Sequence, residues 1–179
     1  MKNGFFLVLL TTILLFNTTP FAAAKFYACN SKYALCTTAP CTPMTGKKDE
    51  VLCACDVKTG YSAATQNCQP VKQTQAGELV YSRYYPVKSY VTCTNNRPWA
   101  WCLDKPCIID KKNPSKAVCA CSVVSDLGPY VIVTDKNTAT TCTTGIISSA
   151  TIEQITDITD FLKTQPQPKP FPINRVAYN

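Results

Sequence analysis

Two stretches of the chain, 51-VLCACDVKTGYS-62 and 117-AVCACSVVSDLGPY-130, carry the same Cys-Ala-Cys followed by a Gly and a Tyr. The cysteines around them repeat as well, because the second to fifth members of each set are separated by 4, 11 and 1 residues in both halves. Upstream, 34-ALCTTAPC-41 corresponds to 100-AWCLDKPC-107. Matching gaps with matching neighbours indicate that one cysteine-rich unit has been duplicated within the chain.

The duplication predicts two cysteine-rich modules, residues 25–69 and 89–145, joined by a linker over residues 70–88. A module of about 50 residues is too small to be held by an apolar core alone, so disulfides are expected to replace the missing core. Alternate residues of a strand point to one face, so the two cysteines of each Cys-Ala-Cys should reach different partners. The spacing otherwise leaves the pairing open. The predicted disulfide cysteines are Cys29, Cys36, Cys41, Cys53, Cys55, Cys68, Cys93, Cys102, Cys107, Cys119, Cys121 and Cys142.

The segments between the cysteines predict a small disulfide-rich, mainly β fold, with two tandem antiparallel β modules, a C-terminal helix and a Pro-rich tail. The stretches 50-EVLCACDV-57, 116-KAVCACSVV-124 and 130-YVIVTD-135 are rich in the β-branched and aromatic residues that strands favour. Within the linker, residues 79–81 could add an edge strand.

Residues 146–164 predict one amphipathic helix that docks on a module, with docking on a partner as the alternative. Thr151 and Gln154 have the spacing of a capping box at its start. At helical spacing one face collects Ile152, Ile155, Ile158, Thr159 and Leu162.

The two ends of the chain differ in character from the modules. Residues 1–24 combine an early Lys, an apolar run over residues 5–16 and a closing Ala-Ala-Ala, an order typical of a secretory signal peptide. The run is shorter than the ~20 residues that span a bilayer, although an uncleaved anchor is the alternative. We therefore expect a secreted or periplasmic protein, of bacterial type, with no transmembrane segment after cleavage. Residues 165–179 have a Pro at every second position from 166 to 172, which favours an extended, mobile tail or a recognition peptide.

Composition limits the chemistry available to the chain. It has 12 cysteines, an even number, and in an exported protein these are normally oxidised. It has no His, which excludes His-based triads and imidazole metal ligands. The acidic residues form no repeated pair that would make a carboxylate dyad, so we expect neither an enzyme nor a cofactor. A zinc site is the alternative for the thiols of Cys36, Cys41, Cys53 and Cys55.

The order of six cysteines, with a Cys-x-Cys as fourth and fifth and a Gly-aromatic pair before the sixth, resembles the epidermal-growth-factor-like module. The resemblance implies pairing of the first cysteine with the third, the second with the fourth and the fifth with the sixth. The acidic calcium ligands of that family are missing ahead of Cys29 and Cys93, so calcium is not implied. An unrelated disulfide fold with its own pairing is the alternative. The implied bridges are Cys29–Cys41, Cys36–Cys53, Cys55–Cys68, Cys93–Cys107, Cys102–Cys119 and Cys121–Cys142.

Two pairs of residues are candidate binding sites. Trp99 and Trp101 would share one face of a strand, either as a stacking platform for a sugar or protein partner or as the filling of the second module. Lys47 and Lys48 lie in the loop between Cys41 and Cys53, where they could be presented to a trypsin-like protease or simply be solvated.

The linker and the start of the second module carry a basic aromatic stretch that includes Tyr81, Arg83 and Lys88. In an exported protein such a stretch could meet an anionic surface, rather than nucleic acid, or be ordinary solvated linker. Taken together, these patterns predict an exported interaction protein that binds a protein or polysaccharide at a cell surface, such as a virulence or adhesion factor. A protease inhibitor and a structural envelope component are the alternatives.

Overall fold

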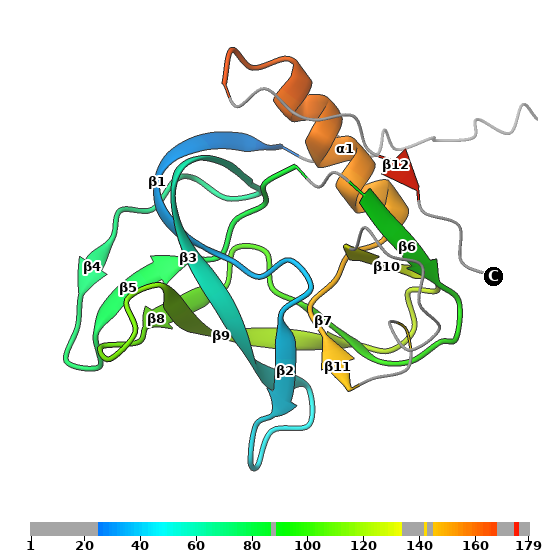
Figure 1. The fold of residues 1–179 in the computed structure, drawn as a ribbon, viewed down its shortest axis with the longest axis horizontal. Coiled ribbons are helices and arrows are strands. Elements are labelled where there is room, and N and C mark those ends of the chain that lie inside the picture. Colours follow the sequence, from blue (N-terminus) through cyan, green and yellow to red (C-terminus); the bar gives the residue numbers. More distant parts are fainter. Residues whose placement is uncertain (1–24, 87–88, 134–141, 143–144, 168–173, 176–179) are drawn as a thin grey trace, which may run out of the picture.

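A computed structural model describes residues 25–86, 89–133, 142, 145–167 and 174–175. Over these residues the fold is mainly β with one helix, as predicted (Figure 1). The predicted signal peptide lies outside the described residues. The elements are β1 (Tyr27–Leu35), β2 (Pro40–Pro43), β3 (Glu50–Ala64), β4 (Lys72–Gln73), β5 (Glu78–Tyr81), β6 (Ser89–Cys93), β7 (Trp99–Trp101), β8 (Pro106–Ile109), β9 (Lys116–Val124), β10 (Tyr130–Val133), β11 (Ile146–Ile147), α1 (Ile152–Lys163) and β12 (Asn174–Arg175).

Each module is built as an antiparallel meander around its Cys-Ala-Cys strand. In the first module β3 pairs with β1 and β2, and in the second β9 pairs with β7 and β8. Burial alternates along β3, where Cys53 and Cys55 are buried and Ala54 between them is exposed. The period of two follows from the pleat of a strand, and it directs all the sulfur atoms of this segment to one face.

The two modules join directly through β3 and β9, which pair antiparallel. In this register Cys53 lies opposite Cys119, Val51 opposite Cys121, and Cys55 opposite Ala117. Cys53 and Cys119 occupy the same place in the duplicated units, so a pseudo-twofold axis passes between them. The modules therefore form one nine-stranded sheet and bury one shared core (Figure 1).

Residues 70–88, predicted as a linker, contribute two strands to this sheet. β5 pairs with β8, so the predicted strand over residues 79–81 is present. It does not lie at the edge of the sheet, because β4 pairs with its other side. Gly77 closes the turn between β4 and β5 with a φ of +145°, and a Cβ there would approach the carbonyl oxygen of Ile109 to 3.1 Å. Only glycine tolerates both conditions.

Helix α1 lies against the sheets and is held by the predicted apolar face. Ile155, Ile158, Thr159 and Leu162 are buried, which confirms docking on the modules. Both hydrogen bonds of the predicted capping box are present. The helix begins later than predicted, because residues 146–147 pair with β2 as β11. Among the described residues, no helix is long and apolar enough to cross a membrane.

A small second sheet lies beside the helix. β6 pairs antiparallel with β10 and parallel with β12. Of the predicted Pro-rich tail, the described residues include only 165–167 and the two residues of β12. Beneath this sheet a separate apolar cluster contains Val91, Trp99, Tyr130 and Ile132. β6 and β10 occupy the places that the start of β1 and the end of β3 have in the first module, since Cys93 lies opposite Tyr130 and Cys29 lies opposite Ser62. Helix α1 and β12 have no counterpart within residues 25–69 of the first module, and they make the molecule asymmetric.

Candidate functional site

All twelve cysteines form disulfides, nested in the same way in both modules. The first cysteine pairs with the sixth, the second with the fifth, and the third with the fourth. The prediction that the two cysteines of each Cys-Ala-Cys reach different partners is confirmed. The bridges implied by the growth-factor-like resemblance are wrong, because the meander sets Cys41 directly opposite Cys53 across β2 and β3. The bridges are Cys29–Cys68, Cys36–Cys55, Cys41–Cys53, Cys93–Cys142, Cys102–Cys121 and Cys107–Cys119.

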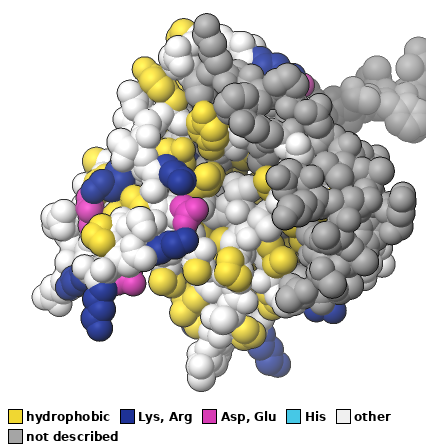
Figure 2. All heavy atoms as spheres, viewed as in Figure 1, with side chains coloured by type: hydrophobic (Ala, Val, Ile, Leu, Met, Phe, Trp, Pro, Cys, Tyr) yellow, Lys and Arg dark blue, Asp and Glu magenta, His cyan; other side chains and the backbone are white. Residues whose placement is uncertain are grey.

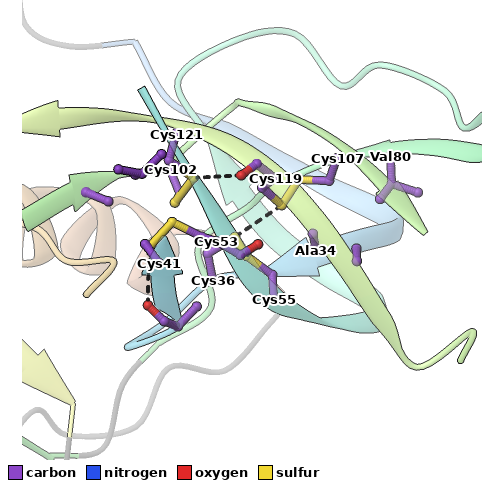
Figure 3. Packing of buried hydrophobic residues seen from close by; sticks show 14 of the residues in the cluster. Ala34, Cys36, Cys41, Cys53, Cys55, Val80, Cys102, Cys107, Cys119 and Cys121 are labelled. Carbon is purple, nitrogen blue, oxygen red and sulfur yellow. Dashed lines mark hydrogen bonds between the residues drawn. A yellow bond between two sulfur atoms is a disulfide. The ribbon is translucent and has the colours of Figure 1, made fainter. Parts of the chain in front are cut away.

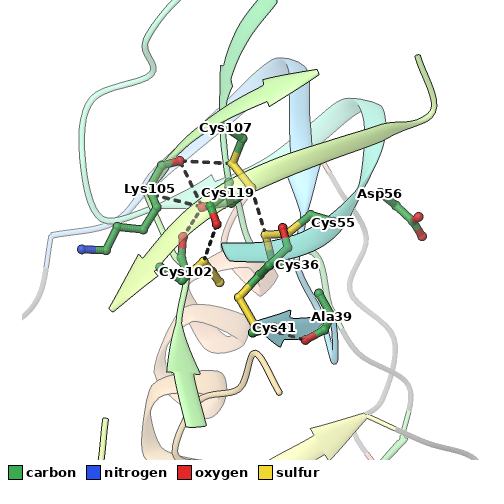
Figure 4. Close-up of a disulfide and its surroundings, with 12 residues drawn as sticks. Cys36, Ala39, Cys41, Cys55, Asp56, Cys102, Lys105, Cys107 and Cys119 are labelled. Atoms are coloured by element: carbon green, nitrogen blue, oxygen red, sulfur yellow. Dashed lines mark hydrogen bonds between the residues drawn. A yellow bond between two sulfur atoms is a disulfide. The ribbon is translucent and has the colours of Figure 1, made fainter. Parts of the chain in front are cut away.

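Four of these bridges stack against one another at the junction of the modules (Figure 3). The sulfur atoms of Cys36 and Cys119, which belong to different modules, are 3.4 Å apart (Figure 4). The core thus consists largely of sulfur, with Val51, Val80 and Ile109 packed around it. The four sulfur atoms proposed as an alternative zinc site form two disulfides, Cys36–Cys55 and Cys41–Cys53, so they offer no thiolate to a metal ion.

The two tryptophans share one face as predicted but have different surroundings. Their rings touch edge to face, with centroids 6.3 Å apart. Trp99 is 1% exposed and stacks on Tyr130, so it belongs to the core. Trp101 is half-buried, and it lines a cavity. The face predicted for a sugar or a partner is therefore reduced to the ring of Trp101, which lines the cavity.

Lys47 and Lys48 lie at the exposed tip of the hairpin between β2 and β3, braced by the Cys41–Cys53 bridge. The tip is a tight turn in which the Lys47 N–H donates to the carbonyl of Met44. The Lys47 ammonium lies 3.7 Å from the carboxylate of Glu50. Trp101 lines the cavity but neither lysine does, so the predicted binding residues do not form one site.

Arg83 is not part of an exposed basic surface, which corrects that part of the basic aromatic prediction. It is 5% exposed, and its Nη1 lies 2.5 Å from Oδ1 of Asp104. The other carboxylate oxygen accepts the backbone N–H of Thr65 at 2.7 Å and its hydroxyl at 2.6 Å. Burial lowers the pKa of Arg83, and the neighbouring Asp104 opposes this shift. Asp104 of the second module is thus tied to the first module through Thr65 and to the linker through Arg83.

A cavity of about 270 Å³ lies between α1 and the two modules. Both modules and the helix contribute to its walls, which include Cys36 and Cys102 of the stacked bridges. Its apolar lining comes mainly from Phe26, Trp101, Leu103, Val131, Ile155 and Ile158.

Three hydroxyls that line the cavity are already engaged within the protein. The Ser82 hydroxyl donates to the carbonyl of Cys102, and the Ser149 hydroxyl donates to that of Val131. The Thr38 hydroxyl accepts the N–H of Val133 at 2.9 Å. Because these groups are satisfied, the cavity presents a mainly apolar interior to an occupant.

Sequence reasoning identified Trp101 as a candidate but missed the cavity and the Arg83–Asp104 pair. The lining residues are spread along the sequence from Phe26 to Ile158, so no local sequence pattern predicts that they line one cavity. One signal was available: Asp104 stands between Cys102 and Cys107, where the first module has Thr38, and thus breaks the repeat.

No family model, curated protein or solved structure matches this chain. The functional argument therefore rests on the cavity and the residues that form it.

Proposed function

We propose that this protein is an exported binding protein without catalytic activity, which holds a small apolar ligand in the cavity beneath α1. The observation that carries the proposal is the cavity itself. Aromatic and aliphatic side chains from both modules and the helix line it, and the hydroxyls of Ser82 and Ser149 are already bonded. Ligand sites are typically concave, mostly apolar and a few hundred Å³ in volume. Six disulfides suit a protein that works in an oxidising space, at or outside a cell surface.

Binding is favoured over catalysis by the hydrogen bonds around Thr65, a cavity-lining residue whose hydroxyl contacts a carboxylate. The hydroxyl of Thr65 donates a hydrogen bond to the carboxylate of Asp104, which is also how a nucleophile meets its general base. The buried carboxylate of Asp104 also binds the guanidinium of Arg83 and the backbone N–H of Thr65, so its oxygens are occupied by structural bonds. The arrangement stabilises the fold and leaves the threonine unactivated.

The test uses Trp101 as a reporter, because its half-buried ring lines the cavity. Apolar probes such as nonan-1-ol should change tryptophan fluorescence in a saturable manner. Ala150→Phe places a ring in the cavity wall and should abolish the response. Ala54→Phe makes the same change on an exposed strand position and should preserve it. Binding that persists in Ala150→Phe, or is absent from the wild type, would contradict the proposal.

A protease inhibitor is the second candidate function, and the disulfide-braced exposure of Lys47 is the observation that favours it. Inhibitor loops of that kind offer an extended backbone to the protease, in the manner of an added strand. Here the backbone of Lys47 is held in a turn, which makes this candidate weaker. Titration of trypsin with the protein tests it directly: stoichiometric loss of activity that disappears in Lys47→Ala would favour the inhibitor.

A further inference from the structure

We infer that the ligand of this cavity is an aliphatic chain whose head is cationic rather than a carboxylate. The inference rests on the proposed function and adds to it the charge of the ligand. It follows from the size of the cavity, from three lining hydroxyls that are already hydrogen-bonded, and from the charges that line it.

The volume sets the length of the chain. A methylene group is similar in size to a water molecule, whose share of liquid volume is ~30 Å³. A cavity of about 270 Å³ therefore accepts roughly nine such groups. Since the hydroxyls of Ser82 and Ser149 already donate to backbone carbonyls, a polar head would lose its hydration inside without replacement. The chain is expected to enter first, with its head at the solvent boundary.

The charges of the lining favour a cation at that boundary. Asp157 both lines the cavity and is exposed on α1, so its carboxylate marks the boundary with solvent. Within the described part of the chain, no salt bridge includes Asp157. The only cationic side chain of the lining is Arg83, whose charge is compensated by Asp104 and whose Nη2 donates to Gln69.

The start of α1, which lies beside the same cavity, does not offer an alternative place for an anion. The Thr151 N–H donates to the side chain of Gln154, and the Gln154 N–H donates to the side chain of Thr151. Glu153 adds a negative charge to the first turn. An anionic head would meet carboxylates on this side rather than open N–H donors.

The test compares three probes of one chain length, nonan-1-amine, nonan-1-ol and nonanoate, by titration of tryptophan fluorescence below their micellar concentrations. We expect the amine to bind tightest and nonanoate weakest, with steps of about threefold because the ion pair is solvent-exposed. The overall net charge of +7 would favour nonanoate, so a preference for the amine cannot come from the charge of the whole protein. The preference should shrink at high ionic strength.

Two matched variants locate the effect. Asp157→Asn should bring the amine and the alcohol to within twofold of each other. Asp160→Asn, one turn along α1 and outside the cavity lining, removes the same charge and should keep the order of the three probes. Nonanoate binding as tightly as the amine, or an unchanged order in Asp157→Asn, would overturn this inference and leave the proposed function intact. Failure of all three probes to bind would overturn both.

Discussion

Replacing Asp104 with Asn tests how much the buried network of Asp104, Arg83 and Thr65 stabilises the junction of the two modules. The carboxylate is 2% exposed and accepts bonds from Arg83 and from the backbone and hydroxyl of Thr65. An asparagine has the same shape but only one acceptor oxygen, so its NH₂ group must face either the guanidinium or the Thr65 N–H. Asp104 has a φ of +62°, a conformation that Asn tolerates well, so backbone strain does not complicate the comparison.

The expected loss is about 3–5 kcal/mol in the free energy of unfolding, because the substitution leaves the Arg83 charge buried without its partner. Guanidinium titration with the disulfides intact measures it, with the m-value as a check that the unfolded state is unchanged. Asp126→Asn, in an exposed loop, serves as the control and should stay within about 0.5 kcal/mol of wild type. Adding Arg83→Met to Asp104→Asn removes the unpaired charge and should recover part of the loss. A cost below about 1 kcal/mol for Asp104→Asn would refute the reasoning.

Three further predictions concern stability. Burial, with a smaller contribution from Tyr85, raises the pKa of Tyr33 from 10.0 to about 12. Since the unfolded chain loses this proton first, the free energy of unfolding should be unaffected below pH 10 and fall by about 2–3 kcal/mol between pH 10 and 12. Unfolding of Tyr33→Phe, measured across the same pH range, should lack this decrease. Thr151→Ala removes the helix cap and should cost about 1 kcal/mol by chemical denaturation, whereas Thr156→Ala, an exposed position of the same helix, should cost less than half as much; equal losses would contradict the capping argument. Gly77→Ala should destabilise by about 1–3 kcal/mol more than Gly46→Ala, because both have positive φ but only Gly77 would meet a backbone oxygen at 3.1 Å; similar melting temperatures for the two variants would count against it.

Much of the architecture follows from local pattern. The repeated spacing of the cysteines predicted the duplication, the period of two along β3 and β9 predicted that each Cys-Ala-Cys serves two bridges, and Thr151 with Gln154 predicted the start of α1. Each of these features depends on residues within a few positions of one another, where side-chain direction is set by the strand or helix itself. The helix boundary was less predictable, since residues 146–147 pair with β2 as a strand.

The pairing of the disulfides, the packing of the modules and the candidate site depended on tertiary structure. Cys41 meets Cys53 because β2 and β3 form a hairpin, and Cys36 of one module approaches Cys119 of the other because β3 pairs with β9. Neither contact can be predicted from the spacing of the cysteines along the chain. The cavity is likewise lined by residues from both modules and α1. Arg83 can be buried because the folded chain places the carboxylate of Asp104 beside its guanidinium. The sequence by itself determined which segments become strands, which becomes the helix and which cysteines act alike; contacts between distant segments decided which cysteines bond and where a ligand would fit, because burial and surface shape arise only when those segments pack together.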